Sequence, residues 1–157
     1  MHFSIFLLWL YLHQSMIVFN HIPINTYSSH SLIDWIAGLA SYYNVEIKRL
    51  QYNFVEESTL LQINQDHLKH DTHTDIITFS YASTSTIEAE IFISTNRMYE
   101  NAPLHGETIE NEMIRLLSHG FLHAIGFKDS NSEEKSQMTI EENRCINMFH
   151  VKQEKDV

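Results

Sequence analysis

One stretch of the sequence carries the pattern of a metal site: His119-Gly-Phe-Leu-His123-Ala-Ile-Gly126-Phe-Lys-Asp129. Its two histidines are four residues apart in a segment with a helical pattern, and side chains four apart on a helix are neighbours on one face. Gly126 can adopt a positive φ and end the helix, so that the chain turns back and brings Asp129 towards the two imidazoles. Two histidines, one carboxylate and an open position for water form the ligand set of a catalytic zinc site.

The spacing matches the metzincin protease motif, in which a histidine and a glutamate are followed at fixed offsets by a second histidine, a glycine and a third histidine. Two positions depart from it, because Gly120 stands in place of the general-base glutamate and Asp129 in place of the third histidine. Histidines four apart also occur on surfaces and in cores without any metal. The glycine and the carboxylate at matching offsets are therefore what favours a metal site here.

Length and composition suit one globular domain, which we expect to span residues 16–157 of the 157. The chain has 20 acidic and 10 basic residues, a net charge of −10 with neutral histidines. This balance is unusual for a protein that binds nucleic acid, which generally carries a basic patch. Cys145 is the single cysteine, so no disulfide can form within one chain; we interpret it as a small core residue, and a reducing cytosol fits this usage.

Residues 1–15 include an apolar run from Phe3 to Leu12, shorter than the roughly 20 residues of a membrane-spanning helix. A signal peptide would carry a basic start and a small-residue cleavage site, and neither pattern is present here. Met16 opens a plausible strand. We therefore expect the native chain to begin at Met16, with residues 1–15 as upstream sequence; a secretion signal and an additional packed segment are the alternatives.

Strand and helix patterns along the chain predict an α+β fold, with a small mixed sheet of about four strands packed with helices around a central motif helix. Strands are expected at 16–20, 45–55, 76–81 and 87–94, the last two as an antiparallel hairpin. Helices are expected at 32–43 (capped by Ser29 or Ser31), 58–67, 95–101 (broken by Pro103), 109–125 (capped by Thr108) and 132–149. Apolar residues surround most of the fourth helix, which indicates that it is mostly buried.

One polar strip remains on this motif helix. At 100° per residue, His119 and His123 share it with Glu112, and Arg115 flanks it. We therefore predict His119, His123 and Asp129 as metal ligands, and name Glu112 and Arg115 as candidates to support them from behind.

Three segments, in this order, resemble the YbeY family of metal-dependent endoribonucleases of ribosomal RNA maturation. The family motif H-G-x-L-H-x-x-G-Y-D-H is similar to residues 119–129. A second signature resembles residues 63–79, and a third the strand at 89–94. The resemblance covers roughly residues 16–149.

The resemblance implies a single-strand-specific, zinc-dependent endoribonuclease that acts in the 3′-end maturation of small-subunit ribosomal RNA and in ribosome quality control. It implies one Zn²⁺ per chain, with Mn²⁺ or another divalent ion as an alternative. Ribosomal RNA, the small subunit and its proteins are the implied partners, the location is cytoplasmic, and no membrane is involved. A metal-activated water would attack the phosphodiester, while Gly120 leaves the general base unassigned.

The sequence departs from the family pattern at the third metal ligand and at a residue thought to bind RNA. Asp129 replaces the usual histidine, which favours harder ions slightly and makes a bound water a weaker acid. Leu68 stands where the family often has an arginine thought to contact RNA, so Lys69 and Lys128 are the nearest basic candidates. Asp75 is a further candidate for the RNA cleft, and a cap of the turn before its strand is the favoured alternative for this residue. A non-catalytic ribosome-assembly factor and, less favoured because of Gly120, a zinc peptidase are the alternative functions.

Overall fold

The computed structural model describes residues 16–68, 74–81 and 85–156, and of Leu68 only the backbone. Its centre is a four-stranded sheet in the order β1-β2-β4-β3, formed by β1 (Met16–Asn20), β2 (Glu46–Val55), β3 (Ile76–Ser80) and β4 (Thr86–Ser94). β1 and β4 run parallel to β2, whereas β3 runs antiparallel to β4. The predicted α+β class, the mixed sheet and the hairpin are confirmed. The predictions for residues 1–15 and for Lys69 lie outside the described residues.

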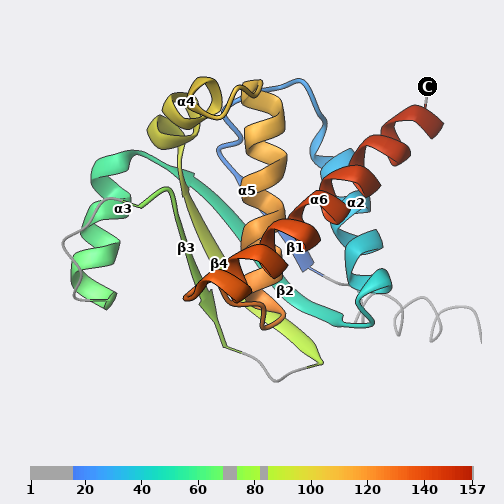
Figure 1. Cartoon of the computed structure of the whole chain (residues 1–157), viewed down its shortest axis with the longest axis horizontal. Coiled ribbons are helices and arrows are strands. Elements are labelled where there is room, and N and C mark those ends of the chain that lie inside the picture. Colours follow the sequence, from blue (N-terminus) through green and yellow to red (C-terminus); the bar gives the residue numbers. More distant parts are fainter. Residues whose placement is uncertain (1–15, 69–73, 82–84, 157) are drawn as a thin grey trace, which may run out of the picture.

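Within the described ranges, five α-helices and one π-helical segment accompany the sheet: α2 (Ser29–Tyr42), α3 (Glu57–Ile63) with η1 (Asn64–Leu68), α4 (Thr95–Leu104), α5 (Ile109–Ala124) and α6 (Ser132–Lys155). Figure 1 shows α5 lying over the sheet, with α6 and α2 beside it and α3 at the opposite side of the molecule. In the part of the chain that is described, no helix combines the length and the apolar character needed to cross a membrane.

The motif helix α5 is the centre of the core. The Thr108 side chain accepts a hydrogen bond from the Asn111 amide and caps it, as predicted. Its buried residues surround most of the helix: Glu112, Met113, Ile114, Leu116, Leu117, Ser118, Gly120, Phe121 and Leu122. A Cβ atom at Gly120 would lie 2.9 Å from Ile91 Cδ1 and 3.2 Å from Ile76 Cδ1. The missing side chain therefore lets α5 pack directly onto β3 and β4.

Helix ends differ from the sequence predictions at two N-terminal positions. The cap of α2 is Ser28, not Ser29 or Ser31, because the Ser28 hydroxyl accepts the Ser31 amide and the helix starts three residues earlier than the apolar pattern does. The stretch predicted as one short helix at 58–67 is an α-helix that widens into a π-helix at Asn64. The π-helical segment begins with the polar residues Asn64 to His67, and a hydrophobic pattern cannot distinguish i→i+5 from i→i+4 hydrogen bonds there.

Two helices also run further than predicted. α4 passes through Pro103 and ends at Leu104, because a proline so close to the end disrupts only the last turn. α6 continues past the predicted end at residue 149 to Lys155. Lys152 and Lys155 lie in its last turn, where positive charge stabilises the negative end of a helix.

Helix α6 packs against α5 and also against α2. The Trp35 indole donates a hydrogen bond of 3.0 Å to the Cys145 carbonyl, and the Trp35 and Phe149 rings meet edge to face. Cys145 is fully buried, as predicted, and burial raises the pKa of its thiol to about 11. This thiol is therefore a protonated core group at neutral pH.

Candidate metal centre

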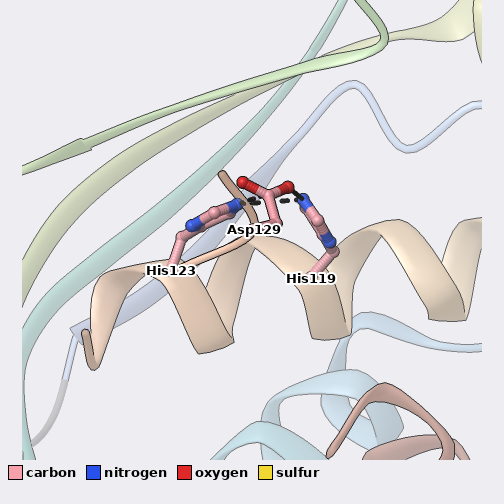
Figure 2. A group of neighbouring side chains, drawn as sticks. All are labelled: His119, His123 and Asp129. Carbon is pink, nitrogen blue, oxygen red and sulfur yellow. Dashed lines mark hydrogen bonds and ion pairs between the residues drawn. The ribbon is translucent and has the colours of Figure 1, made fainter. Parts of the chain in front are cut away.

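The side chains predicted as ligands converge on one point beside α5 (Figure 2). The Nε2 atoms of His119 and His123 are 3.0 Å apart, and Asp129 Oδ2 lies 3.4 Å from each of them. Donor atoms around a tetrahedral ion with bonds of about 2.0–2.1 Å stand about 3.3–3.4 Å apart. Two imidazole nitrogens and one carboxylate oxygen at these separations fit a zinc ion, and they could hold a metal ion together.

The turn after α5 brings Asp129 back to the histidines. Gly126 has a φ of 106°, a conformation that a residue with a side chain rarely adopts. The Phe127 amide donates to the Leu122 carbonyl (3.0 Å) and the Gly126 amide to the His123 carbonyl (3.0 Å), which closes the helix end in a Schellman-like turn. The positive φ predicted for Gly126 is confirmed.

In each histidine, Nε2 faces the candidate metal position and the Nδ1 atom on the other side of the ring has a protein partner. His123 Nδ1 lies 3.0 Å from the Phe127 carbonyl oxygen, and His119 Nδ1 lies 3.5 Å from Glu142 Oε2. Both partners are acceptors, so they assign the ring proton to Nδ1 and leave the Nε2 lone pair for an ion. Both lone pairs thus face the point where the Asp129 carboxylate also lies.

Arg115 joins the carboxylates that lie behind His119. Its guanidinium donates to Glu112 (Nε–Oε2 3.0 Å) and to Glu142 (Nη1–Oε1 3.5 Å), and it lies 3.8 Å from Asp75. Although burial alone would lower the pKa of Arg115, the hydrogen bonds to Glu112 and the charges of the three carboxylates raise it above its ordinary value. Among the described residues, no hydrogen bond or ion pair joins Glu112 or Arg115 to a candidate ligand; Glu142 links Arg115 to His119.

Glu142 was missed by the sequence reasoning, although a signal for it exists. Met138, Cys145 and Phe149 form the buried stripe of α6, and Glu142 lies within that stripe at helical spacing. A carboxylate on the apolar side of an amphipathic helix needs a buried partner. Here its partners are Arg115 and His119.

The three candidate ligands line one side of a cavity of about 520 Å³ between α5 and β3. Its remaining walls are polar and apolar in mixture: Asn64, Thr74, Asp75, Ile76, Ile77, Thr78 and Ser80. An ion held by His119, His123 and Asp129 would therefore face open space, as a catalytic metal does.

Of the two described residues predicted to bind RNA, Asp75 lies at the cavity and Lys128 does not. Asp75 lines the cavity, while Asn101 (3.3 Å) and Arg115 (3.8 Å) hold its carboxylate. Its carbonyl also accepts the Ser94 amide, which extends the pairing of β3 with β4 by one residue, so the backbone of Asp75 continues the sheet while the residue lines the cavity. Lys128 is exposed and is not part of the cavity wall.

Comparison with known proteins finds one family. The family model described as Endoribonuclease YbeY matches residues 20–150. A protein named Endoribonuclease YbeY from Flavobacterium psychrophilum is 36% identical over 139 residues, 88% of this chain and 99% of that protein. Another of that name, from Cytophaga hutchinsonii, is 39% identical over 115 residues, which are 73% and 80% of the two chains. The solution structure of TM1509 from Thermotoga maritima has the same fold, with a TM-score of 0.60 and 22% identity over 90% of this chain and 93% of that one.

Proposed function

This chain belongs to the YbeY family, and from that membership we propose that it is a metal-dependent endoribonuclease that hydrolyses single-stranded RNA. One observation carries the proposal: His119, His123 and Asp129 present three metal-ligating atoms within 4.8 Å of one another on the wall of an open cavity. A structural metal, by contrast, usually has four protein ligands and no open side.

We assign Zn²⁺, one ion per chain, to this centre, with Mn²⁺ as the alternative that the carboxylate ligand favours. His119 and His123 would bind it as neutral imidazoles through Nε2, and Asp129 would contribute one negative charge. When bound, such an ion lowers the pKa of a coordinated water and polarises a phosphoryl oxygen. The chain's own part is to hold the three ligands and to shape the cavity for the substrate.

The surroundings of Gly120 support a nuclease over a peptidase. A metzincin peptidase carries its general base directly after the first histidine. In this chain that position points into the sheet, where even a Cβ atom would lie 2.9 Å from Ile91. A carboxylate there could not reach the metal centre while α5 keeps this packing.

The biological setting in the proposal follows the family resemblance. We place the activity in 3′-end maturation of small-subunit ribosomal RNA and in ribosome quality control, in the cytoplasm, with the small subunit and its proteins as partners. Lys69 and Lys128 are the basic residues that we propose contact RNA, and Asp75, on the cavity wall, is the acidic candidate.

The test begins with protein purified without an affinity-tag metal. Its metal content should be about one ion per chain, and it should cut a single-stranded oligoribonucleotide but not the same sequence in a duplex. A chelator should stop cleavage and added Zn²⁺ or Mn²⁺ should restore it. Protein that retains its metal but leaves every RNA intact would favour the assembly-factor alternative, and cleavage of an unstructured peptide instead of RNA would favour a peptidase.

A further inference from the structure

One edge of the sheet lies along the cavity. β3 is the last strand in the sheet order, so among the described residues no strand pairs with its outer side. In an antiparallel pair, backbone groups point alternately towards the partner strand and away from it. The Tyr81 amide donates to the Glu88 carbonyl (2.8 Å) and the Ser94 amide to the Asp75 carbonyl (2.9 Å). Odd-numbered residues of β3 therefore face β4, and even-numbered residues present their N–H and C=O groups outward.

Three residues of β3 thus have outward backbone groups, and two of them are free to bind a ligand. Both outward backbone groups of Ile76 bond to the Thr74 hydroxyl, which accepts from the Ile76 amide (3.5 Å) and donates to the Ile76 carbonyl (3.1 Å). The outward groups of Thr78 and Ser80 have no partner in the described part of the chain. Both residues line the cavity that also contains His119 and His123.

The side-chain hydroxyl of Thr78 is a second group without a partner at this edge in the described part of the chain. Its Oγ1 atom is buried at the cavity wall and has no hydrogen-bond partner in the described part of the chain. Buried polar groups in proteins nearly always have a partner, and exceptions concentrate where a ligand, an ion or a water completes the set. The backbone and the side chain of Thr78 therefore both lack a partner beside the metal centre.

The charges around the cavity restrict how it could hold a polyanion. Its described wall contains no lysine or arginine, and it does contain Asp75 and Asp129. Arg115, the nearest guanidinium to Asp75, is shared among Asp75, Glu112 and Glu142. Apart from a metal ion and the two histidines, the donors that these walls offer to a phosphate are therefore uncharged backbone, hydroxyl and amide groups.

We infer that the free edge of β3 at Thr78 and Ser80 is a subsite for the ribose–phosphate backbone of single-stranded RNA beside the scissile bond. The outward amides donate to phosphate oxygens, and the outward carbonyls accept from ribose 2′-hydroxyls, the group that distinguishes RNA from DNA. The subsite rests on the proposed ribonuclease function, and the experiment below separates the failure of one from the failure of the other.

Two variants of one residue test the edge. Thr78→Pro removes both the outward N–H and the hydroxyl, and proline is tolerated on an edge strand where the N–H does not take part in the ladder. Thr78→Val removes only the hydroxyl. The matched control is Thr86→Val, the same change on β4 at a position outside the cavity wall.

The measured quantities are kcat/KM for a labelled single-stranded oligoribonucleotide, its affinity by fluorescence anisotropy in a chelator, and Zn²⁺ affinity by competition. Loss of a hydrogen bond to a charged group should lower kcat/KM for Thr78→Pro about tenfold or more, mainly through KM, with Zn²⁺ affinity unchanged. Thr78→Val should lose about threefold to tenfold, and Thr86→Val should match the wild type. A 2′-deoxy substrate should bind wild type more weakly, because the outward carbonyls lose their donors, and should lose about as much as RNA does on Thr78→Pro, because it keeps the phosphates that the amide contacts.

Salt supplies a second readout. Because Lys69 and Lys128 are the only basic residues assigned to the RNA, log KM should rise with log salt with a slope of about 1.4 or less, from about 0.7 per phosphate on a single strand. A slope several times larger would overturn the inference, since it would require a basic surface in place of the strand edge.

The remaining outcomes are also decisive. Wild-type kinetics and affinity in a folded Thr78→Pro protein would overturn the subsite; if that protein does not fold, wild-type behaviour of Thr78→Val would do the same. Tighter binding of an extended peptide than of RNA would overturn it as well. If wild type binds RNA in an edge-dependent manner but never cuts it, the proposed function fails and the subsite stands.

Discussion

Glu142 Oε2 lies 3.5 Å from His119 Nδ1, although the two residues belong to different helices and are 23 positions apart. Glu142 is only 7% exposed, and its other oxygen faces Arg115 at 3.5 Å. A carboxylate behind a ligating histidine fixes the orientation of the ring and raises its basicity. Helix α6 therefore supplies a partner for a candidate ligand on α5.

Replacing Glu142 by Gln should weaken metal binding without removing a ligand. Loss of such a partner typically costs 10–100-fold in metal affinity, because the imidazole loses its charged acceptor. Competition with a chromophoric chelator measures this. Glu141→Gln is the control, because Glu141 is equally buried but pairs with Tyr43 and Arg144. Equal affinities of the two variants would show that Glu142 does not position His119.

Asp129→Ala should weaken metal binding more than Lys128→Ala does, because it leaves only two histidines. Asp129→His should retain zinc and, by removing a negative ligand, make the bound water more acidic. The alkaline rise of the pH–rate profile for RNA cleavage should then move to lower pH. Wild-type metal affinity and cleavage in Asp129→Ala would show that another group completes the site.

Gly126→Ala should reduce stability and metal affinity together. The space around its Cβ position is open, so the strain comes only from the φ of 106°, and it disturbs the turn that carries Asp129. Gly106 is the matched control, since it also has a positive φ (68°) and open space but precedes α5. Gly106→Ala should cost about 1 kcal/mol of stability and leave the metal affinity unchanged; a parallel loss of metal there would refute the role of the Gly126 turn.

The stability of the fold should fall at alkaline pH partly through Cys145. Burial raises the pKa of its thiol from 9.0 to about 11, so its contribution is complete below pH 9 and is lost as the pH rises towards 11. The shift corresponds to about 2–3 kcal/mol. Urea unfolding of the wild type and of Cys145→Ala at pH 7, 9 and 11 should show the difference between them shrinking. A difference that stays constant with pH would contradict the assignment.

Gly120→Ala and Gly38→Ala should have opposite signs, although both replace a helical glycine. A Cβ at Gly120 would lie 2.9–3.2 Å from Ile91 and Ile76, an overpacking that costs about 1–3 kcal/mol and outweighs the gain in helix propensity. Nothing lies within 4 Å at Gly38, so alanine there should stabilise α2 by about 0.5–1 kcal/mol. Thermal or urea unfolding measures both; stabilisation by both changes would mean that α5 sits less tightly on the sheet.

Features set by local sequence could be predicted. The spacing of His119, His123 and Asp129, with a glycine between, was enough to bring these side chains together, because a helix and its end are determined over few residues. The apolar residues that alternate along β4, among them Ile91 and Ile93, are the buried ones, so the sequence pattern marks the buried face of this strand. The hairpin of β3 with β4 followed from the short separation between the two strands.

Features that join distant parts of the chain could not be predicted. The parallel pairing of β1 and β4 with β2, and the sheet order that leaves β3 at an edge, depend on contacts between segments far apart in sequence. The contact of Glu142 with His119 is of the same kind. Helix ends such as Ser28 and Lys155 depended on single hydrogen bonds and charges, which a hydrophobic pattern does not record.

The contact at Gly120 also limits how this site could be redesigned. An engineer who wished to turn the centre towards peptide hydrolysis would add a glutamate after the first histidine, as in metzincin enzymes. That side chain has no room against Ile76 and Ile91, so the sheet would first have to be repacked with smaller residues. The route from one chemistry to the other therefore needs several coordinated substitutions, and its first steps would lower stability before any new activity could appear.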